Sequence, residues 1–295
     1  MARITRKAFA KINLHLDVTG IRTDGFHSVN TVMQSISLCD EVTVSLSDSE
    51  GFTLACNVAG VPLDEKNLAA RAFIAYKAAT NMPLGAHISI KKSIPIAAGL
   101  AGGSADAAAT LLALNELCNQ PLSISELCEI GARLGSDVPF CIVGGSAFAD
   151  GKGEVLHPFP SMPECTIVIA CGGEGVSTPE AYRTLDRIYN NFSSAEDYTP
   201  ADISQLHMAA SANDIFAVSN SLYNIFEEPI LSVRPVASKL KSTMLKCGAI
   251  GAMMSGSGPS VFGIFTDSAS AMLACKKIET LGVTPFVCTP TGKID

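Results

Sequence analysis

The segment 35–46 places its large aliphatic residues at even positions, with polar residues between them. This two-residue period predicts a half-buried strand. The segment 67–80 instead repeats apolar residues at a spacing of three or four, which predicts a helix with Asn67 as its N-cap. A second strand is predicted at 86–92. The chain therefore begins as a mixture of strands and helices.

A glycine-rich stretch, GLAGGS at residues 99–104, separates that strand from an alanine-rich segment. Ser104 is predicted to cap a helix of ~15 residues. Unshielded N–H groups before a helix and the positive end of the helix favour an anion, so the stretch is a candidate phosphate cradle. Close packing of a small-residue helix on a sheet explains the glycines equally well. Neither a Walker loop nor a G-x-G-x-x-G motif is present.

The rest of the chain continues this alternation. SISE at 123–126 is a capping box that starts another helix, glycine and proline mark a turn at 135–140, and 146–156 is expected to be extended. Three prolines near residue 160 suggest a boundary, which predicts domains 1–158 and 159–295. Segregated antiparallel strands with helices indicate an α+β fold. In the second half, strands are expected at 165–171, 249–255, 260–265 and 284–290, and helices at 178–188, 220–246 and 267–280.

Composition and charge exclude several classes of protein. Hydrophobic residues form 47% and charged residues 17% of the 295 residues, which is typical of a folded globular chain. The net charge of −7, without a Lys/Arg cluster, argues against a nucleic-acid partner. Charged residues interrupt the N-terminus and the longest small-apolar run, so we expect neither a signal peptide nor a membrane span, and a cytoplasmic location. The ten cysteines show no zinc-site spacing.

The segment 95–108, P-x-x-A-G-L-A-G-G-S-A-D-A-A, resembles the second motif of the GHMP kinases. It departs from the usual pattern at Ala101, where glycine is usual, and at Ala105, where serine is common. Neither change blocks a main-chain cradle, provided that Ala101 keeps a negative φ. The segments 9–42, 135–154 and 253–265 resemble further signatures of the family, in the family's order.

This resemblance implies a fold and a reaction. It implies a two-domain GHMP kinase fold, with an N-terminal domain like domain 2 of ribosomal protein S5, a ferredoxin-like C-terminal domain, and a site between them. The segment 9–42 is similar to the branch that acts on an alcohol linked to cytidine diphosphate. The implied reaction transfers the γ-phosphoryl group of ATP, with Mg²⁺, to a hydroxyl of that small molecule.

The same resemblance identifies Asp137 and Lys11 as catalytic residues. A carboxylate that orients and deprotonates the acceptor hydroxyl suits a loose phosphoryl-transfer transition state. An ammonium beside it favours the ionised carboxylate and offsets charge that develops on the transferred group. Judged without the motifs, the two residues are better explained as a turn aspartate and a solvated strand lysine.

The resemblance also assigns residues to ATP. Asn67 is expected to contact ATP as well as to cap its helix. The glycine-rich third motif is expected to support the phosphate loop, although it is also a simple hairpin turn. No protein ligand of Mg²⁺ is predicted, since phosphates and water supply most of its ligands. The remaining residues assigned to ATP are Pro95, Gly99, Leu100, Ala101, Gly102, Gly103 and Ser104, and those of the third motif are Gly256, Ser257 and Gly258.

On the acceptor side, the resemblance matches Phe26, His27 and Tyr182 to a pocket for cytosine. A base held between aromatic faces, with its edge read by His27, is sound recognition chemistry. A core aromatic at a turn is the structural alternative for Phe26. Asn13 shares a strand face with Lys11 and is expected to contact the hydroxyls of the acceptor.

Three other functions compete with this interpretation. Another kinase of the family, for mevalonate, phosphomevalonate or homoserine, needs the phosphate loop but not the DGFH segment at 24–27. An S5-like fold also serves as an RNA-binding module, which the acidic charge and the pair Lys11 and Asp137 disfavour. A catalytically silent ATP-binding sensor is the third. The sequence indicates no oligomeric state.

Overall fold

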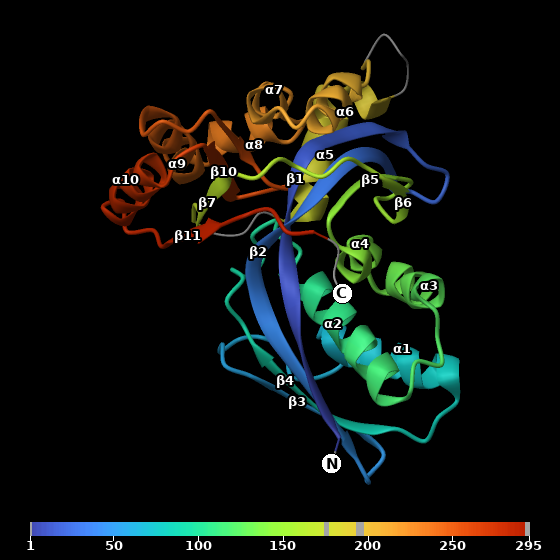
Figure 1. Ribbon diagram of the computed structural model, residues 1–295. Helices are drawn as coiled ribbons and strands as arrows, with labels where there is room; N and C mark the ends of the chain where they lie inside the picture. Colours follow the sequence, from blue (N-terminus) through green and yellow to red (C-terminus); the bar gives the residue numbers. More distant parts are fainter. Residues whose placement is uncertain (1, 174–176, 193–197, 293–295) are drawn as a thin grey trace.

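The computed structural model describes residues 2–173, 177–192 and 198–292, and within them the strands form two sheets (Figure 1). The larger has seven strands, with the order β3-β4-β2-β1-β8 and with β5 joining β2 to β6. Its strands are β1 (Arg3–Ile21), β2 (His27–Ser47), β3 (Gly51–Cys56), β4 (Gly85–Lys91), β5 (Ser146–Asp150), β6 (Val155–Pro158) and β8 (Tyr223–Asn224).

The smaller sheet has four antiparallel strands in the order β11-β7-β10-β9. Its strands are β7 (Thr166–Cys171), β9 (Gly251–Met254), β10 (Ser260–Phe265) and β11 (Pro285–Cys288).

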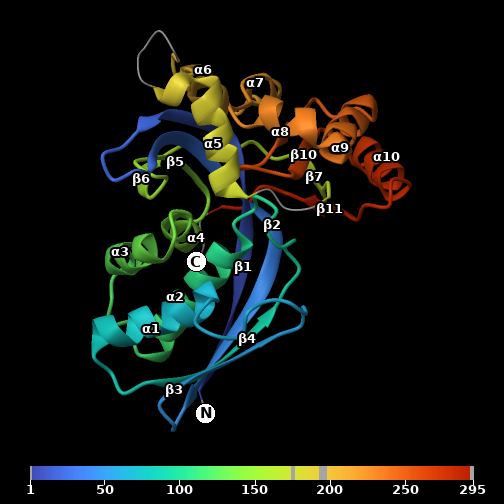
Figure 2. The same ribbon diagram turned by 180° about the vertical axis from the view of Figure 1, so that it is seen from behind.

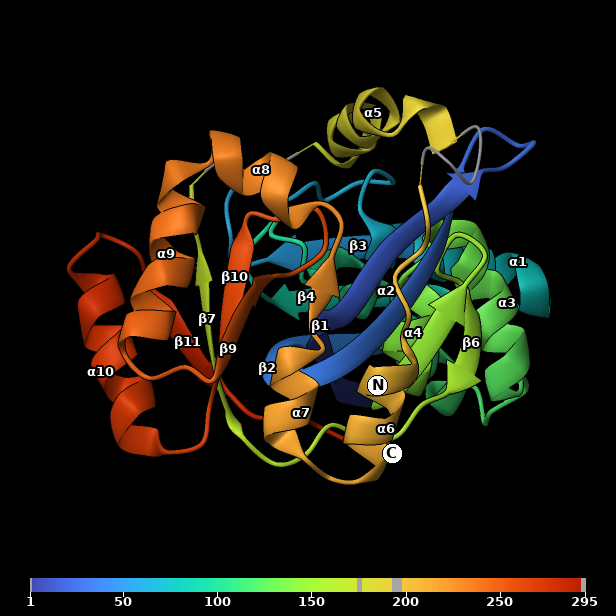
Figure 3. The same cartoon turned by 90° about the horizontal axis from the view of Figure 1, so that it is seen from above.

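The helices lie in separate groups beside the sheets (Figures 1 and 3). The first group, to the right of the lower parts of β1 and β2 in Figure 1, comprises α1 (Leu68–Thr80), α2 (Gly102–Leu117), α3 (Ile124–Leu134) and α4 (Val138–Val143). The others are α5 (Thr178–Ile188), the 3₁₀ turn η1 (Asn190–Phe192), α6 (Ser204–Ser211), α7 (Ile215–Asn220), α8 (Glu227–Val233), α9 (Pro235–Lys246) and α10 (Ser268–Glu279).

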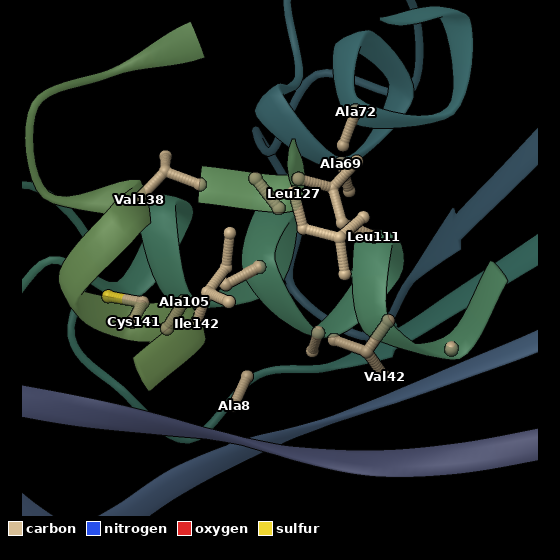
Figure 4. Packing of buried hydrophobic residues seen from close by; sticks show 14 of the residues in the cluster. Ala8, Val42, Ala69, Ala72, Ala105, Leu111, Leu127, Val138, Cys141 and Ile142 are labelled. Atoms are coloured by element: carbon tan, nitrogen blue, oxygen red, sulfur yellow. The ribbon is translucent and has the colours of Figure 1, made fainter. Parts of the chain in front are cut away.

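Four apolar cores join these layers in the described ranges, and one of them packs α5 and α8 against the first two strands. The first packs α1 to α4 on the large sheet, as Figure 4 shows for Leu111, Leu127 and Val42. The second joins the two sheets, and the third lies between the small sheet and helices α9 and α10. Strand β7 serves both: Ile167 belongs to the second core and Val168 to the third. Alternate residues of a strand point to opposite faces, so a sheet covered on both sides needs a continuous apolar run.

Most elements agree with the predictions, and the α+β fold class is confirmed. The capping box at Ser123 and Glu126 starts α3. The prediction that Ser104 caps α2 is wrong, because the helix begins at Gly102 and Ala101 stands at the cap without a side-chain bond.

Three other predictions also need correction. The turn predicted at 135–140 is shorter, because its proline lies in the first turn of α4, where the missing N–H is tolerated. The helix predicted at 220–246 is divided into β8, α8 and α9, and a proline follows Arg234 at the last break. Helices α6 and α7 were not predicted.

The two halves of the chain interlock. Strand β8 pairs with β1 in parallel, at His15 with Tyr223, although the two strands are far apart in sequence. After β11 the chain returns to β2, where Ile36 forms a bridge with Pro290. The predicted boundary at 158/159 coincides with the end of β6, and the division into domains 1–158 and 159–295 stays a prediction. In the described ranges, no helix is long and apolar enough to cross a membrane.

Candidate active site

Lys11 and Asp137 lie side by side although 126 positions separate them in sequence, since Lys11 Nζ is 4.0 Å from Asp137 Oδ2. Lys11 is buried on β1, with only 4% of its surface exposed, which excludes a solvated strand lysine. Its main-chain N–H donates to the carbonyl of Leu100, so the glycine-rich loop rests against this strand.

Asp137 occupies the N-cap position of α4, but its side chain makes no capping hydrogen bond. Its carboxylate lines two adjoining cavities. One, the inner cavity of about 160 Å³, also contains Lys11, Asn13 and Gly256. The carboxylate is therefore placed to meet a ligand rather than to stabilise the helix end.

Asn13 connects Lys11 to the third motif. Its Oδ1 accepts hydrogen bonds from Lys11 Nζ at 2.7 Å and from the Gly256 N–H at 2.9 Å, and its Nδ2 donates to Thr31 Oγ1 at 2.8 Å. These bonds hold the lysine ammonium in place. A contact with acceptor hydroxyls stays a prediction for Asn13, whose side chain borders the inner cavity.

The glycine-rich loop needs two of its glycines for packing inside the protein. Gly99 has φ +76°, and a Cβ there would meet the Ser255 carbonyl oxygen at 2.3 Å. Its own carbonyl accepts a hydrogen bond from Ser255 Oγ at 3.1 Å. A Cβ on Gly102 would lie 3.0 Å from Ile94 and 3.2 Å from Lys92 Nζ. The packing explanation therefore accounts for both positions.

Gly103 and Ser104 differ from these two glycines. A Cβ on Gly103 would meet only Leu68, at an ordinary 3.6 Å, so the protein itself does not require glycine there. Both residues line a cavity of about 550 Å³, the glycine cavity, at the start of α2. Ser104 also borders the cavity of Asp137. The first turn of a 16-residue helix thus faces a space beside the carboxylate.

Ala101 overturns one condition of the sequence analysis. Its φ is +57°, in the left-handed region, and not negative as the cradle argument required. An alanine in this conformation carries strain of about 1–2 kcal/mol that glycine would not have.

We expect Ala101→Gly to raise the free energy of unfolding by ~1 kcal/mol, because glycine adopts a positive φ without strain. Ala105→Gly is the control of opposite sign: it lies inside α2 and is buried, so it should lower that energy by about 1 kcal/mol or more. Denaturant titration measures both. A loss of stability in Ala101→Gly would contradict the strain.

Of the other residues assigned to ATP, two line the glycine cavity and one has a buried side chain. Asn67 caps α1, since its Oδ1 accepts from the Ala69 N–H at 2.9 Å and its Nδ2 donates to the Pro62 carbonyl. It also lines the glycine cavity, as does Pro95. The assignment of Leu100 to ATP needs correction. Its side chain is buried in the core between the sheets, so Leu100 can contact ATP only through its main chain.

The third motif forms the hairpin between β9 and β10 and also packs on the glycine-rich loop. Gly256 and Gly258 both have positive φ. A Cβ on Gly256 would approach the Gly99 carbonyl oxygen at 3.0 Å. Ser257 Oγ lies 3.1 Å from Thr178 Oγ1 at the start of α5. The third motif is therefore a hairpin turn that also supports the glycine-rich loop.

The residues assigned to cytosine line a third cavity of about 590 Å³, the aromatic cavity, together with Asp137. Phe26 is 58% exposed, which excludes a core aromatic. Tyr182 does not leave both ring faces open: it stacks on His27 at 4.5 Å and 30°. Its edge-on neighbour is Phe226, and burial raises the pKa of Tyr182 to about 12.

The sequence analysis missed several residues of the aromatic cavity. Lys152 lines both this cavity and the inner one, with Nζ 4.8 Å from the centre of the Phe26 ring. Arg183 and Asp186 belong to α5, which Figure 2 shows in yellow with its first turn near α2. The available signal was the spacing of Asp186, which lies four positions after Tyr182 and therefore on the same helix face.

A buried ionic group lies beside the glycine cavity. Lys92 Nζ donates to Asp40 at 2.5 Å and to Asp106 at 2.8 Å. Asp40 also accepts from the main chain at Ser93 and Ile94, which holds the end of β4 against β2. Burial raises the pKa of Asp106 to about 7. This ionic group therefore holds in place the segment that leads from β4 into the glycine-rich loop.

Thr178 borders all three cavities. The glycine cavity offers helix N–H groups, the aromatic cavity offers rings and two cations, and the inner cavity holds the lysine and the carboxylate between them. This arrangement can bring an anionic donor and an aromatic acceptor together at Asp137.

Two family models match parts of the chain. Residues 67–145 match the family model for the GHMP kinases N terminal domain, and residues 206–282 match that for the GHMP kinases C terminal domain. A homoserine kinase structure from Cytophaga hutchinsonii has a TM-score of 0.73 at 22% identity, covering 99% of this chain and 96% of the other, which supports the fold.

More similar relatives carry one name. The chain is 43% identical over 262 residues to the 4-diphosphocytidyl-2-C-methyl-D-erythritol kinase of Brevibacillus brevis, covering 89% of this chain and 87% of the relative. It is 40% identical over 290 residues to that of Gloeobacter violaceus, covering 98% and 94%. A crystal structure of 4-(cytidine 5'-diphospho)-2C-methyl-D-erythritol kinase superposes with a TM-score of 0.81 at 32% identity, covering 98% and 100%. The chain therefore belongs to the GHMP kinases, in the family of the 4-diphosphocytidyl-2-C-methyl-D-erythritol kinases.

Proposed function

We propose that the protein transfers the γ-phosphoryl group of ATP to the 2-hydroxyl of 4-diphosphocytidyl-2-C-methyl-D-erythritol, a step in non-mevalonate isoprenoid precursor biosynthesis. The observation that carries the proposal is the position of Asp137, whose carboxylate makes no capping bond, lies 4.0 Å from a buried lysine and borders both the inner cavity and the aromatic cavity. The relatives that cover most of the chain support the choice of acceptor.

Asp137 acts as the general base in this scheme. Its carboxylate accepts the proton of the 2-hydroxyl while that oxygen bonds to the γ-phosphorus, and the bridging oxygen leaves with its electron pair on ADP. Lys11 offsets the negative charge on the transferred group. Because Asn13 holds the Lys11 ammonium by a buried hydrogen bond, little reorganisation is needed during transfer.

The ATP phosphates bind at the first turn of α2, where Gly103 leaves the N–H groups unshielded. When bound with ATP, Mg²⁺ would offset the charge of the phosphates. In the described part of the chain, no cluster of three or more His, Cys, Asp or Glu side chains could hold a metal alone. That donor set fits an ion held chiefly by phosphate and water, with the Ser104 hydroxyl as a candidate oxygen donor.

The acceptor binds in the aromatic cavity. Phe26 and Tyr182 supply ring surface for cytosine. Lys152 and Arg183 line the same cavity and carry the positive charge that a diphosphate requires. Lys152 also reaches the inner cavity, so it can hold the diphosphate while the polyol extends toward Asp137.

We expect Tyr182→Ala to weaken acceptor affinity by roughly ten- to a hundredfold, since aromatic stacking on a base contributes about 1–3 kcal/mol. ATP affinity should not change. Tyr182→Phe, which keeps the ring, should retain most of the acceptor affinity. Isothermal titration with each ligand measures the effect, and equal acceptor affinity in all three proteins would show that Tyr182 does not contact the base.

An acceptor panel tests the proposed function. The protein is incubated with ATP, Mg²⁺ and either the cytidyl substrate, mevalonate, phosphomevalonate or homoserine, and ADP formation is followed. The proposal is supported if the protein turns over the cytidyl substrate and none of the other three acceptors. Preference for another acceptor would assign the chain to a different kinase specificity, and ATP binding without turnover on any acceptor would favour a nucleotide sensor.

A further inference from the structure

His27 is held in the aromatic cavity by contacts from three sides. Its Nε2 lies 2.7 Å from Asp186 Oδ1, and its ring stacks on Tyr182 at 4.5 Å. Phe192 approaches edge-on, at 6.3 Å between ring centres. His27 and Asp186 are both largely buried, with side-chain exposures of 13% and 20%. The orientation of the imidazole is thus fixed by residues that follow it by more than 150 positions.

The partner of Nε2 determines where the ring proton lies. A carboxylate only accepts hydrogen bonds, so the short contact requires a proton on Nε2. In the neutral imidazole the other nitrogen, Nδ1, then carries a lone pair and accepts. Among the described residues, no side chain or main-chain group forms a hydrogen bond with His27 Nδ1. An acceptor without a protein partner therefore remains on a ring that lines the cavity.

Building on the proposed function, we propose that Asp186 sets the base specificity by fixing the tautomer of His27, so that Nδ1 accepts a hydrogen bond from the exocyclic amino group of cytosine. Uracil has a carbonyl oxygen at the same position. Two acceptors would then face each other in a site largely removed from water, which leaves both unpaired. Asp186 is a positioning residue in this scheme, because it acts through His27.

Asp186→Asn provides the test, because an asparagine amide can donate to Nε2 and so move the ring proton to Nδ1. Assays compare kcat/KM for the cytidyl acceptor and its uridyl analogue at a pH where ¹⁵N NMR of the unmodified protein shows a neutral His27 ring. We expect the preference for the cytidyl acceptor to fall by about ten- to a hundredfold. ¹⁵N NMR of His27 should show the Nε2–H tautomer in the unmodified protein and Nδ1–H in the variant. Glu180→Gln, an exposed change on the same helix, is the matched control and should alter neither readout.

The outcomes separate two failures. An unmodified protein that turns over neither acceptor would contradict the proposed function. A protein that prefers the cytidyl acceptor, and whose Asp186→Asn variant keeps that preference, would overturn the specificity role of Asp186 alone. An Nδ1–H tautomer in the unmodified protein would overturn it as well, even if the variant lost activity.

Discussion

Asp137→Asn is expected to lower kcat by about 10²–10⁴, because a positioned general base typically contributes this factor. ATP affinity should change little, since the phosphate contacts proposed here come from the first turn of α2. The protein should fold normally, because the Asp137 side chain makes no capping bond that asparagine would lose. Single-turnover phosphoryl transfer at saturating acceptor measures the loss.

One control variant makes this result specific. Asp48→Asn removes an equal charge at an exposed turn between β2 and β3 and should retain full turnover. Near-normal turnover in Asp137→Asn at saturating substrate would mean that Asp137 is structural, and the catalytic assignment would be wrong.

Gly103→Val is expected to weaken ATP binding by about a hundredfold or more, the equivalent of losing one or two charge-assisted hydrogen bonds. Gly103 has an ordinary helical φ and room for a Cβ, so the variant should remain folded. The valine methyl groups would instead occupy the space that a phosphate needs above the N–H groups. Isothermal titration with an ATP analogue measures the affinity.

The neighbouring glycine is the matched comparison. Gly102→Val should lose stability first, because its Cβ would press on Ile94 and Lys92 within the protein. Gly103→Ala should give an intermediate loss of ATP affinity. Unaltered nucleotide affinity in a folded Gly103→Val protein would return the whole glycine run to the packing explanation.

Local sequence patterns predicted the secondary structure where a local interaction, such as a side-chain cap, decides where a helix begins. The capping box at Ser123 gave the start of α3, and the side-chain cap at Asn67 gave that of α1. The pattern failed where tertiary contacts decide. The N-cap of helix α2 is Ala101, in a left-handed conformation that propensity disfavours, and the contacts of Gly99 with Ser255 hold the loop in that shape.

Long-range pairs were the second limit. The proximity of Lys11 and Asp137 was expected only from the family motifs, because no local period connects β1 with α4. The contact of His27 with Asp186 joins residues 159 positions apart, and neither periodicity nor spacing predicts it. Lys92 was overlooked for the same reason, since its two carboxylate partners come from β2 and α2.

The product itself tests the central claim most directly. The protein is incubated with ATP, Mg²⁺ and 4-diphosphocytidyl-2-C-methyl-D-erythritol, and the product is analysed by ³¹P NMR and mass spectrometry beside the Asp137→Asn variant. We predict one new phosphomonoester on the 2-hydroxyl, an intact diphosphate, and a much lower rate in the variant. A phosphoryl group at another position, or hydrolysis of ATP without transfer to the alcohol, would contradict the account.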